Sequence, residues 1–152
     1  MKIIRGNLWD SKDTAILVTA NSYVNKRGRL VMGRGAALEL KNRQPNIDFV
    51  FGTMISNNYY HLGKYGLLLF EDLQEKRVYG VFQVKYHYKD QADLELIDFS
   101  CKVLNYTLNY TPLIQGDVSM NFPGIGYGGR TVDEILPIIS TLSDKVSIYI
   151  KD

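Results

Sequence analysis

The apolar residues of this chain fall into short runs that predict β-strands. The run Ala15–Ala20 is almost unbroken, which is typical of a strand covered on both faces of a sheet. We therefore expect it to be a central strand. Similar runs predict strands at residues 2–5, 67–71, 77–85, 118–122 and 146–150. Because only residues 72–76 separate two of these runs, a hairpin is the simplest connection between them.

Between the strands, apolar residues recur at helical spacing. One amphipathic helix is predicted by apolar residues three and four positions apart, namely Leu94, Ile97, Cys101, Leu104 and Leu108. Asp90 is its expected N-cap. Thr131 and Glu134 form a capping box that opens another helix, in which Pro137 should cause a kink or a delayed start. A third helix is expected at residues 34–43, ending before Pro45.

Residues 47–55 allow two interpretations. Phe49, Val50 and Phe51 favour a strand, whereas the position just after Pro45 favours a short helix. We choose the helix. Strands and helices then alternate along the chain, which predicts an α/β fold, a three-layer α/β/α sandwich around a central mixed sheet.

Length and composition narrow the class of protein. The chain has 152 residues, with no internal repeat or linker, which predicts one domain over residues 1–152. The 18 Lys and Arg residues nearly balance the 16 Asp and Glu residues, so any basic site must be a local cluster of cations. Cys101 is the one cysteine, which excludes an internal disulfide and fits a reducing compartment. Its position on an apolar helical face predicts that the thiol lies in the core. With no leader and no apolar run of about 20 residues, we expect a cytoplasmic monomer without membrane association.

Two glycine-rich turns are the candidate ligand site. Gly33-Arg34-Gly35-Ala36 runs directly into the helix of residues 34–43, and Gly124-Ile125-Gly126-Tyr127-Gly128-Gly129 lies between a strand and a helix. Glycine lets backbone N–H groups turn inward, and a helix N-terminus attracts anions. Two such turns can face each other at the carboxyl ends of the strands and hold a diphosphate. Alternatively, each is only a tight connection between a strand and a helix.

Several motifs resemble those of macrodomains, the α/β proteins that bind ADP-ribose. Gly6-Asn7-Leu8 is similar to the opening turn of that family, and Val18-Thr19-Ala20-Asn21 keeps the second asparagine of its V-N-x-x-N pattern. Val31-Met32-Gly33-Arg34-Gly35-Ala36-Ala37-Leu38 is similar to the V-M-G-K-G-I-A-L loop of one branch. That branch contains the antitoxin glycohydrolase that removes ADP-ribose from DNA and the human terminal ADP-ribose protein glycohydrolase. The resemblance covers nearly the whole chain.

The resemblance to this branch extends to three further segments. Residues 63–71 resemble its G-K-M-x-V-F-E strand, and residues 82–89 resemble its N-F-P-T-K-x-H-W-R segment, which places Lys85 on the family's catalytic lysine. Residues 123–129 resemble its second loop, P-x-x-G-C-G-x-G-G. Two departures stand out. Arg130 occupies the position where the human enzyme's branch has an acidic residue, with Asp133 the nearest carboxylate, and residues 22–30 form a longer loop than in the antitoxin.

The resemblance implies a role for each candidate residue. Asn7 would contact adenine, Asn21 would orient the distal ribose, and the glycine turns would bind the two phosphates. Lys85 would be the catalytic amine, assisted by Asn21. The implied ligand-binding residues are Asn7, Leu8, Asn21, Val31, Met32, Gly33, Arg34, Gly35, Ala36, Gly124, Ile125, Gly126, Tyr127, Gly128 and Gly129. The pattern predicts no metal and no cofactor, because His87 has no ligand-forming residues at suitable spacing.

Three functions are therefore open. The first is a hydrolase that removes ADP-ribose from a modified nucleic acid or protein, with Lys85 at the anomeric carbon. The second is a module that binds or sequesters ADP-ribose, or a related nucleotide, without chemistry. The third is a phosphatase that acts on the 1″-phosphate of ADP-ribose. Residues 86–89 mix aromatic rings with cations, a composition suited to stacking on bases if the acceptor is nucleic acid.

Overall fold

The computed structural model describes residues 1–59 and 61–151 and has one mixed sheet of six strands. The strands are β1 (Lys2–Arg5), β2 (Ala15–Ala20), β3 (Leu67–Asp72), β4 (Arg77–Gln83), β5 (Val118–Asn121) and β6 (Val146–Ile150). Their order is β1-β6-β5-β2-β4-β3, and only β3 is antiparallel to its neighbour. The predicted hairpin of β3 and β4 and the central place of β2 are both confirmed.

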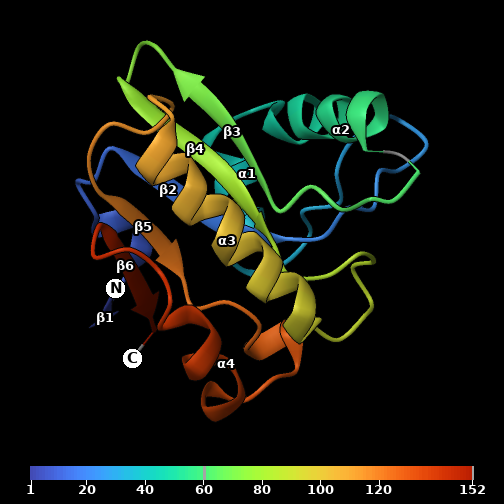
Figure 1. Ribbon diagram of the computed structural model, residues 1–152. Helices are drawn as coiled ribbons and strands as arrows, with labels where there is room; N and C mark the ends of the chain where they lie inside the picture. The colour runs from blue at the N-terminus through green and yellow to red at the C-terminus, as the bar shows by residue number, and fades with distance from the viewer. Residues whose placement is uncertain (60, 152) are drawn as a thin grey trace.

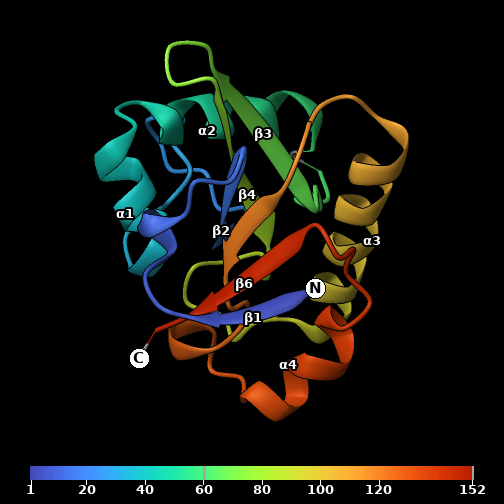
Figure 2. The same ribbon diagram turned by 90° about the vertical axis from the view of Figure 1, so that its left-hand side faces the viewer.

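Four α-helices cover the two faces of this sheet. They are α1 (Gly35–Arg43), α2 (Ile47–Asn58), α3 (Leu94–Tyr110) and α4 (Val132–Ile139). Helices α1 and α2 lie on one side, and α3 and α4 lie on the other (Figures 1 and 2). Each side has its own apolar core, so the three-layer α/β/α prediction is confirmed.

The helix predictions are confirmed with local corrections. Residues 47–55 are helical, and α2 continues to Asn58. The N-cap of α3 is Asp93 and not Asp90, because the Asp93 carboxylate accepts the N–H of Leu96. The capping box of Thr131 and Glu134 opens α4 as expected.

Helix α4 ends two residues after Pro137. Leu142 is buried in the loop that follows. Cys101 lies fully buried in the core. Within residues 1–59 and 61–151, no helix is long and apolar enough to cross a bilayer.

Candidate ligand-binding site

A cavity of about 570 Å³ opens at the carboxyl ends of the central strands, between the two glycine turns. Its lining residues are Thr19, Ala20, Asn21, Val31, Met32, Gly33, Arg34, Gly35, Ala36, Ala37, Val84, Lys85, Tyr88, Lys89, Asn121, Ile125 and Tyr127. Arg34, Lys85 and Lys89 are cationic, and no residue of this lining is acidic. The cavity therefore suits an anionic ligand.

The first glycine turn brings the start of α1 to the cavity. Gly35, the first residue of the helix, has a φ of 58°, which favours glycine. The preceding residue, Arg34, has an extended backbone and forms no side-chain cap for the helix. The first N–H groups of an α-helix have no partner within it, so this uncapped end offers hydrogen-bond donors to an anion.

In the second glycine turn, two of the backbone N–H groups already have partners within the turn. It contains a 3₁₀ turn, η2 (Gly126–Gly128), and it lines the cavity with Ile125 and Tyr127. The N–H groups of Gly128 and Gly129 donate to carbonyls within the turn, 3.2 and 3.0 Å from their acceptors. These glycines, with Gly124 and Gly126, shape the turn but do not line the cavity.

Asn21 holds the loop that follows β2. Its side chain is buried, and its Nδ2 donates to the Val31 carbonyl at 3.0 Å. Its Oδ1 accepts the N–H of Tyr23 at 2.8 Å. One amide thus fixes both ends of the loop at the rim of the cavity, while remaining part of the cavity lining.

The same loop, residues 22–30, is docked on α2. Its last residue, Leu30, is buried and donates to the Asp48 carbonyl at 2.9 Å. Arg29 forms an ion pair with the buried Asp48 carboxylate at 2.8 Å. The backbone of Gly28 passes so close to Gly52 of α2 that a Cβ built there lies 2.1 Å from the Gly28 oxygen. These contacts with α2 hold the loop of residues 22–30 in one position beside the site.

Lys85 lies just after β4, with 9% of its surface exposed. Its Nζ donates to the carbonyls of Tyr88 and Asp90, each at 3.1 Å, and to that of Tyr127 at 3.5 Å. Burial lowers the pKa of Lys85, the Asp90 carboxylate partly opposes this effect, and Arg34 adds to it. The three acceptors match the three N–H groups of an ammonium ion.

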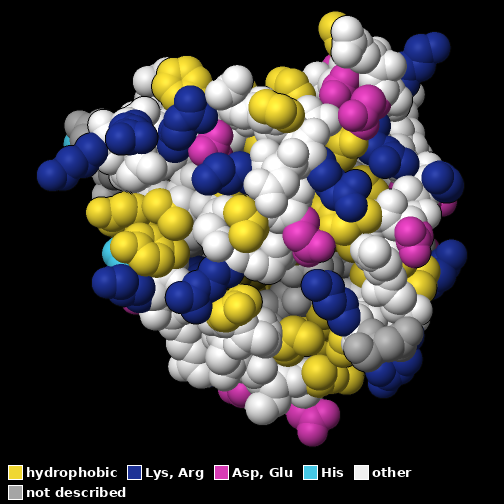
Figure 3. Space-filling model, turned by 180° about the vertical axis from the view of Figure 1, so that it is seen from behind, with side chains coloured by type: hydrophobic (Ala, Val, Ile, Leu, Met, Phe, Trp, Pro, Cys, Tyr) yellow, Lys and Arg dark blue, Asp and Glu magenta, His cyan; other side chains and the backbone are white. Residues whose placement is uncertain are grey.

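An aromatic cluster borders the cavity on the side of Lys85. The ring of His87 stacks on that of Tyr88 with 4.4 Å between centroids, and Tyr23 meets both rings edge-on. Lys89 lies over Tyr88, 5.8 Å from its centroid. Figure 3 shows hydrophobic side chains beside a histidine at one edge of the face opposite to that of Figure 1, with Lys and Arg side chains above and below them. Tyr23 and Tyr88 are 41% and 40% exposed, so their rings are accessible.

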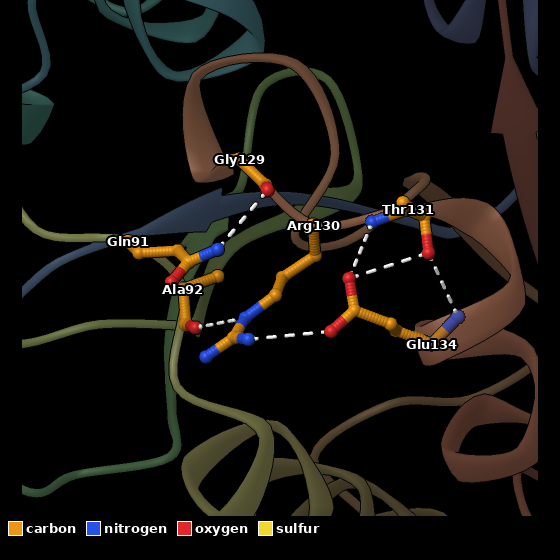
Figure 4. A network of polar contacts seen from close by, with 6 residues as sticks. All are labelled: Gln91, Ala92, Gly129, Arg130, Thr131 and Glu134. Carbon is orange, nitrogen blue, oxygen red and sulfur yellow. Dashed lines mark hydrogen bonds and ion pairs between the residues drawn. The ribbon is translucent and has the colours of Figure 1, made fainter.

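Arg130 is a structural residue that joins two segments. Its Nε donates to the Ala92 carbonyl at 2.7 Å, and its guanidinium reaches Glu134 at 3.3 Å (Figure 4). It thereby ties the second glycine turn to the segment before α3 and to the first turn of α4. Neither Arg130 nor the exposed Asp133 lines the cavity. The acidic residue that the human enzyme's branch has after this loop thus has no counterpart among the residues of the cavity lining.

Two further predicted ligand residues, Asn7 and Leu8, also lie outside the cavity lining. Asn7 caps the 3₁₀ turn η1 (Leu8–Asp10) by accepting the N–H of Trp9 at 3.0 Å, and it lines a separate shallow hollow with Glu39 and Lys151. Leu8 is buried in the core on the α1 and α2 side of the sheet. The structure therefore brings Asn21, Lys85 and the first glycine turn together, and leaves this opening turn apart.

Several lining residues escaped the sequence analysis. Asn121 ends β5, accepts the Thr19 N–H at 3.0 Å and donates to the Thr19 hydroxyl at 2.9 Å. A polar residue at the carboxyl end of a buried strand was the available signal. Arg34 lies over the Tyr127 ring, 5.0 Å from its centroid, a pairing without any sequence signal. No group of three or more metal-ligating side chains occurs in the part of the chain that the structure describes.

Comparisons with known proteins identify the fold. No protein-family model and no curated protein matches the sequence. Among solved structures, DarTG of Thermosipho africanus in complex with ADP-ribose aligns with a TM-score of 0.75 at 18% identity, over 99% of this chain and 41% of that one. The present chain thus spans about two fifths of that protein.

Two isolated macrodomains align over nearly their full length. The DarG macrodomain of Thermus aquaticus gives a TM-score of 0.73 at 21% identity, covering 99% of this chain and 97% of that one. The DarG macrodomain of Mycobacterium tuberculosis gives 0.73 at 21% identity, covering 97% and 95%. The sheet order, the helical layers and these alignments together show that this protein has the macrodomain fold.

Proposed function

We propose that this protein binds ADP-ribose in the cavity between the glycine turns. The diphosphate would lie at the uncapped N-terminus of α1, with Arg34 and Lys89 nearby. Asn21 would orient the distal ribose. One observation carries the proposal: the cavity lining combines three cations with a free helix end and has no acidic residue. The solved complex of a similar fold with ADP-ribose supports the same ligand.

Calorimetry with ADP-ribose tests the proposal, and a pair of glycine variants locates the site. Gly35 and Gly28 both have positive φ, and a Cβ at either makes only ordinary contacts. Gly35→Ala and Gly28→Ala should therefore strain the backbone to a similar degree. Only Gly35 lines the cavity, so only its variant should weaken binding, by about tenfold, through the loss of charge-assisted hydrogen bonds. No heat with millimolar ADP-ribose, or equal losses in both variants, would reject this site.

We further propose hydrolysis of an ADP-ribosyl bond by Lys85. Burial lowers the pKa of Lys85, and its neutral amine would attack the anomeric carbon. A C–N bond forms as the bond to the acceptor breaks, and the acceptor leaves with the electron pair and takes up the proton that the nitrogen loses. Water then cleaves the C–N bond, which releases ADP-ribose and restores Lys85.

A module that binds ADP-ribose without chemistry is the competing function, favoured by the lack of an acidic residue in the cavity lining. Release of ADP-ribose from modified oligonucleotides and proteins separates the two, measured beside a binding titration for wild type, Lys85→Ala and Lys85→Arg. A nucleophilic Lys85 predicts that Lys85→Ala loses turnover but keeps its affinity within a few-fold. Tight binding by a wild-type protein that releases nothing would reject the hydrolase and favour the binding module.

The exposed aromatic cluster favours nucleic acid as the acceptor. The rings of Tyr23 and Tyr88 can stack on bases, while Lys89 and the loop cations Lys26 and Arg27 can contact phosphates. Affinity for a modified oligonucleotide should then exceed that for free ADP-ribose and fall with added salt. Equal affinities that do not respond to salt would instead indicate a protein or small-molecule acceptor.

A further inference from the structure

Tyr127 contacts two of the three cationic residues in the cavity lining, Lys85 and Arg34. Its backbone carbonyl accepts the third N–H of Lys85 at 3.5 Å, the longest of the three contacts of that ammonium. Its ring lies under the guanidinium of Arg34, 5.0 Å away. Tyr127 itself is 67% exposed on the short turn η2, between two glycines. Movement of this turn would therefore change both contacts together.

The contacts of Lys85 distinguish its two protonation forms. An ammonium ion has three N–H donors, whereas a neutral amine has two and a lone pair. The carbonyls of Tyr88 and Asp90, both at 3.1 Å, can satisfy two donors in either form. The Tyr127 carbonyl is then the acceptor that only the ammonium can use, since it would repel the lone pair of an amine. Attack by Lys85 therefore requires this one carbonyl to move.

We infer that Tyr127 is a positioning residue that keeps Lys85 in its unreactive form, and that Arg34 is the latch that holds Tyr127 in place. A diphosphate in the cavity would compete with the Tyr127 ring for the Arg34 guanidinium, because an ionic contact is stronger than an exposed contact with a ring. Release of the ring would free the η2 turn, withdraw the Tyr127 carbonyl and direct the lone pair of Lys85 towards the substrate. This inference rests on the proposed binding of ADP-ribose and adds a coupling between phosphate binding and the state of the lysine.

Nuclear magnetic resonance of lysine ammonium groups tests the coupling without any turnover. In protein labelled with ¹⁵N-lysine, a hydrogen-bonded ammonium shielded from water should give a persistent signal, which Lys85→Arg identifies by its loss. Inorganic pyrophosphate at saturation should accelerate proton exchange of this signal. Tyr127→Leu keeps the carbonyl but removes the ring, and it should accelerate exchange by about two- to fivefold without ligand. Tyr110→Leu, an equally exposed tyrosine at the far end of α3, is the matched control and should change nothing.

Arg34→Met gives the sharpest test, because two explanations of the role of Arg34 predict opposite changes in the exchange rate of the Lys85 signal. The Arg34 charge helps to lower the pKa of Lys85. If Arg34 acted only through its charge, its removal would stabilise the ammonium and slow the exchange. If Arg34 is the latch, exchange becomes faster, while Arg5→Met, at an exposed position of β1 outside the cavity lining, has no effect.

The outcomes separate this inference from the proposed function. Calorimetry with ADP-ribose on the same samples reports binding independently. Binding that is intact while the Lys85 signal ignores pyrophosphate, Tyr127→Leu and Arg34→Met would overturn the latch and leave the binding site standing. Exchange could also become faster in Tyr127→Leu and Arg34→Met while the protein binds no ADP-ribose. That result would support the proposed contacts around Lys85 and reject the proposed ligand.

Discussion

Gly52 is the position at which the long loop beside the site depends on the absence of a side chain. It lies within α2, where alanine is the better helix former by about 1 kcal/mol. Local propensity alone therefore predicts that Gly52→Ala stabilises the protein. A Cβ at this position, however, lies 2.1 Å from the Gly28 oxygen, 2.9 Å from the Leu30 nitrogen and 3.0 Å from the Arg29 Cα. All three atoms are backbone, so the whole loop must move away.

The cost of this movement can be estimated from the contacts that it breaks. The Leu30 N–H would leave the Asp48 carbonyl, now 2.9 Å away, and Arg29 would leave the Asp48 carboxylate, now at 2.8 Å. Asp48 is only 3% exposed, so its polar groups would lose partners in a buried setting. At about 1–3 kcal/mol for each lost contact, and after the gain in helix propensity, Gly52→Ala should destabilise the protein by about 3 kcal/mol.

Urea unfolding measures this difference directly. Ser56→Ala, at an exposed position of the same helix, is the control that changes helix propensity alone, and it should be neutral or slightly stabilising. Because Asn21 and Tyr23 lie at the start of the loop, Gly52→Ala should also weaken ADP-ribose binding. A Gly52→Ala protein as stable as Ser56→Ala would refute the docking of the loop on α2.

Two further predictions concern titrating groups away from the cavity. Burial raises the pKa of the Cys101 thiol to about 12, so iodoacetamide at pH 8 should label it in urea but not in the folded protein; rapid labelling of the folded protein would contradict its burial. Hydrogen bonding from the Thr131 N–H holds the pKa of Glu134 below its ordinary value. The ionised Glu134 side chain therefore contributes its full stabilisation above the ordinary pKa of a glutamate. This stabilisation is lost as the pH falls through the pKa of Glu134 in the folded protein. The stability difference between wild type and Glu134→Gln should accordingly shrink in acid, and a difference independent of pH would contradict this linkage.

The sequence by itself determined most of the secondary structure and the fold class. The unbroken apolar run of β2, the helical spacing of α3 and the capping box at Thr131 are local patterns, and each produced the expected element. Such patterns are reliable because burial on one or both faces constrains residues at fixed intervals along one segment. The N-cap of α3 was misplaced because Asp90 and Asp93 are equally good caps. The choice depends on the contact between the Asp93 N–H and the Val84 carbonyl, 2.8 Å apart, which fixes where the helix begins.

The tertiary structure alone decided which contacts the candidate site residues make. Lys85 marked the site in the sequence, but its hydrogen bonds to Asp90 and Tyr127 depend on how two loops fold back over the end of β4. Asn7, which was predicted to contact the ligand, caps η1 and is not among the residues that line the cavity. Gly52 of α2 is the position against which the backbone of the loop packs. These roles come from atoms far apart in the chain, and their approach is set by the packing of whole layers, which no local spacing of residues encodes.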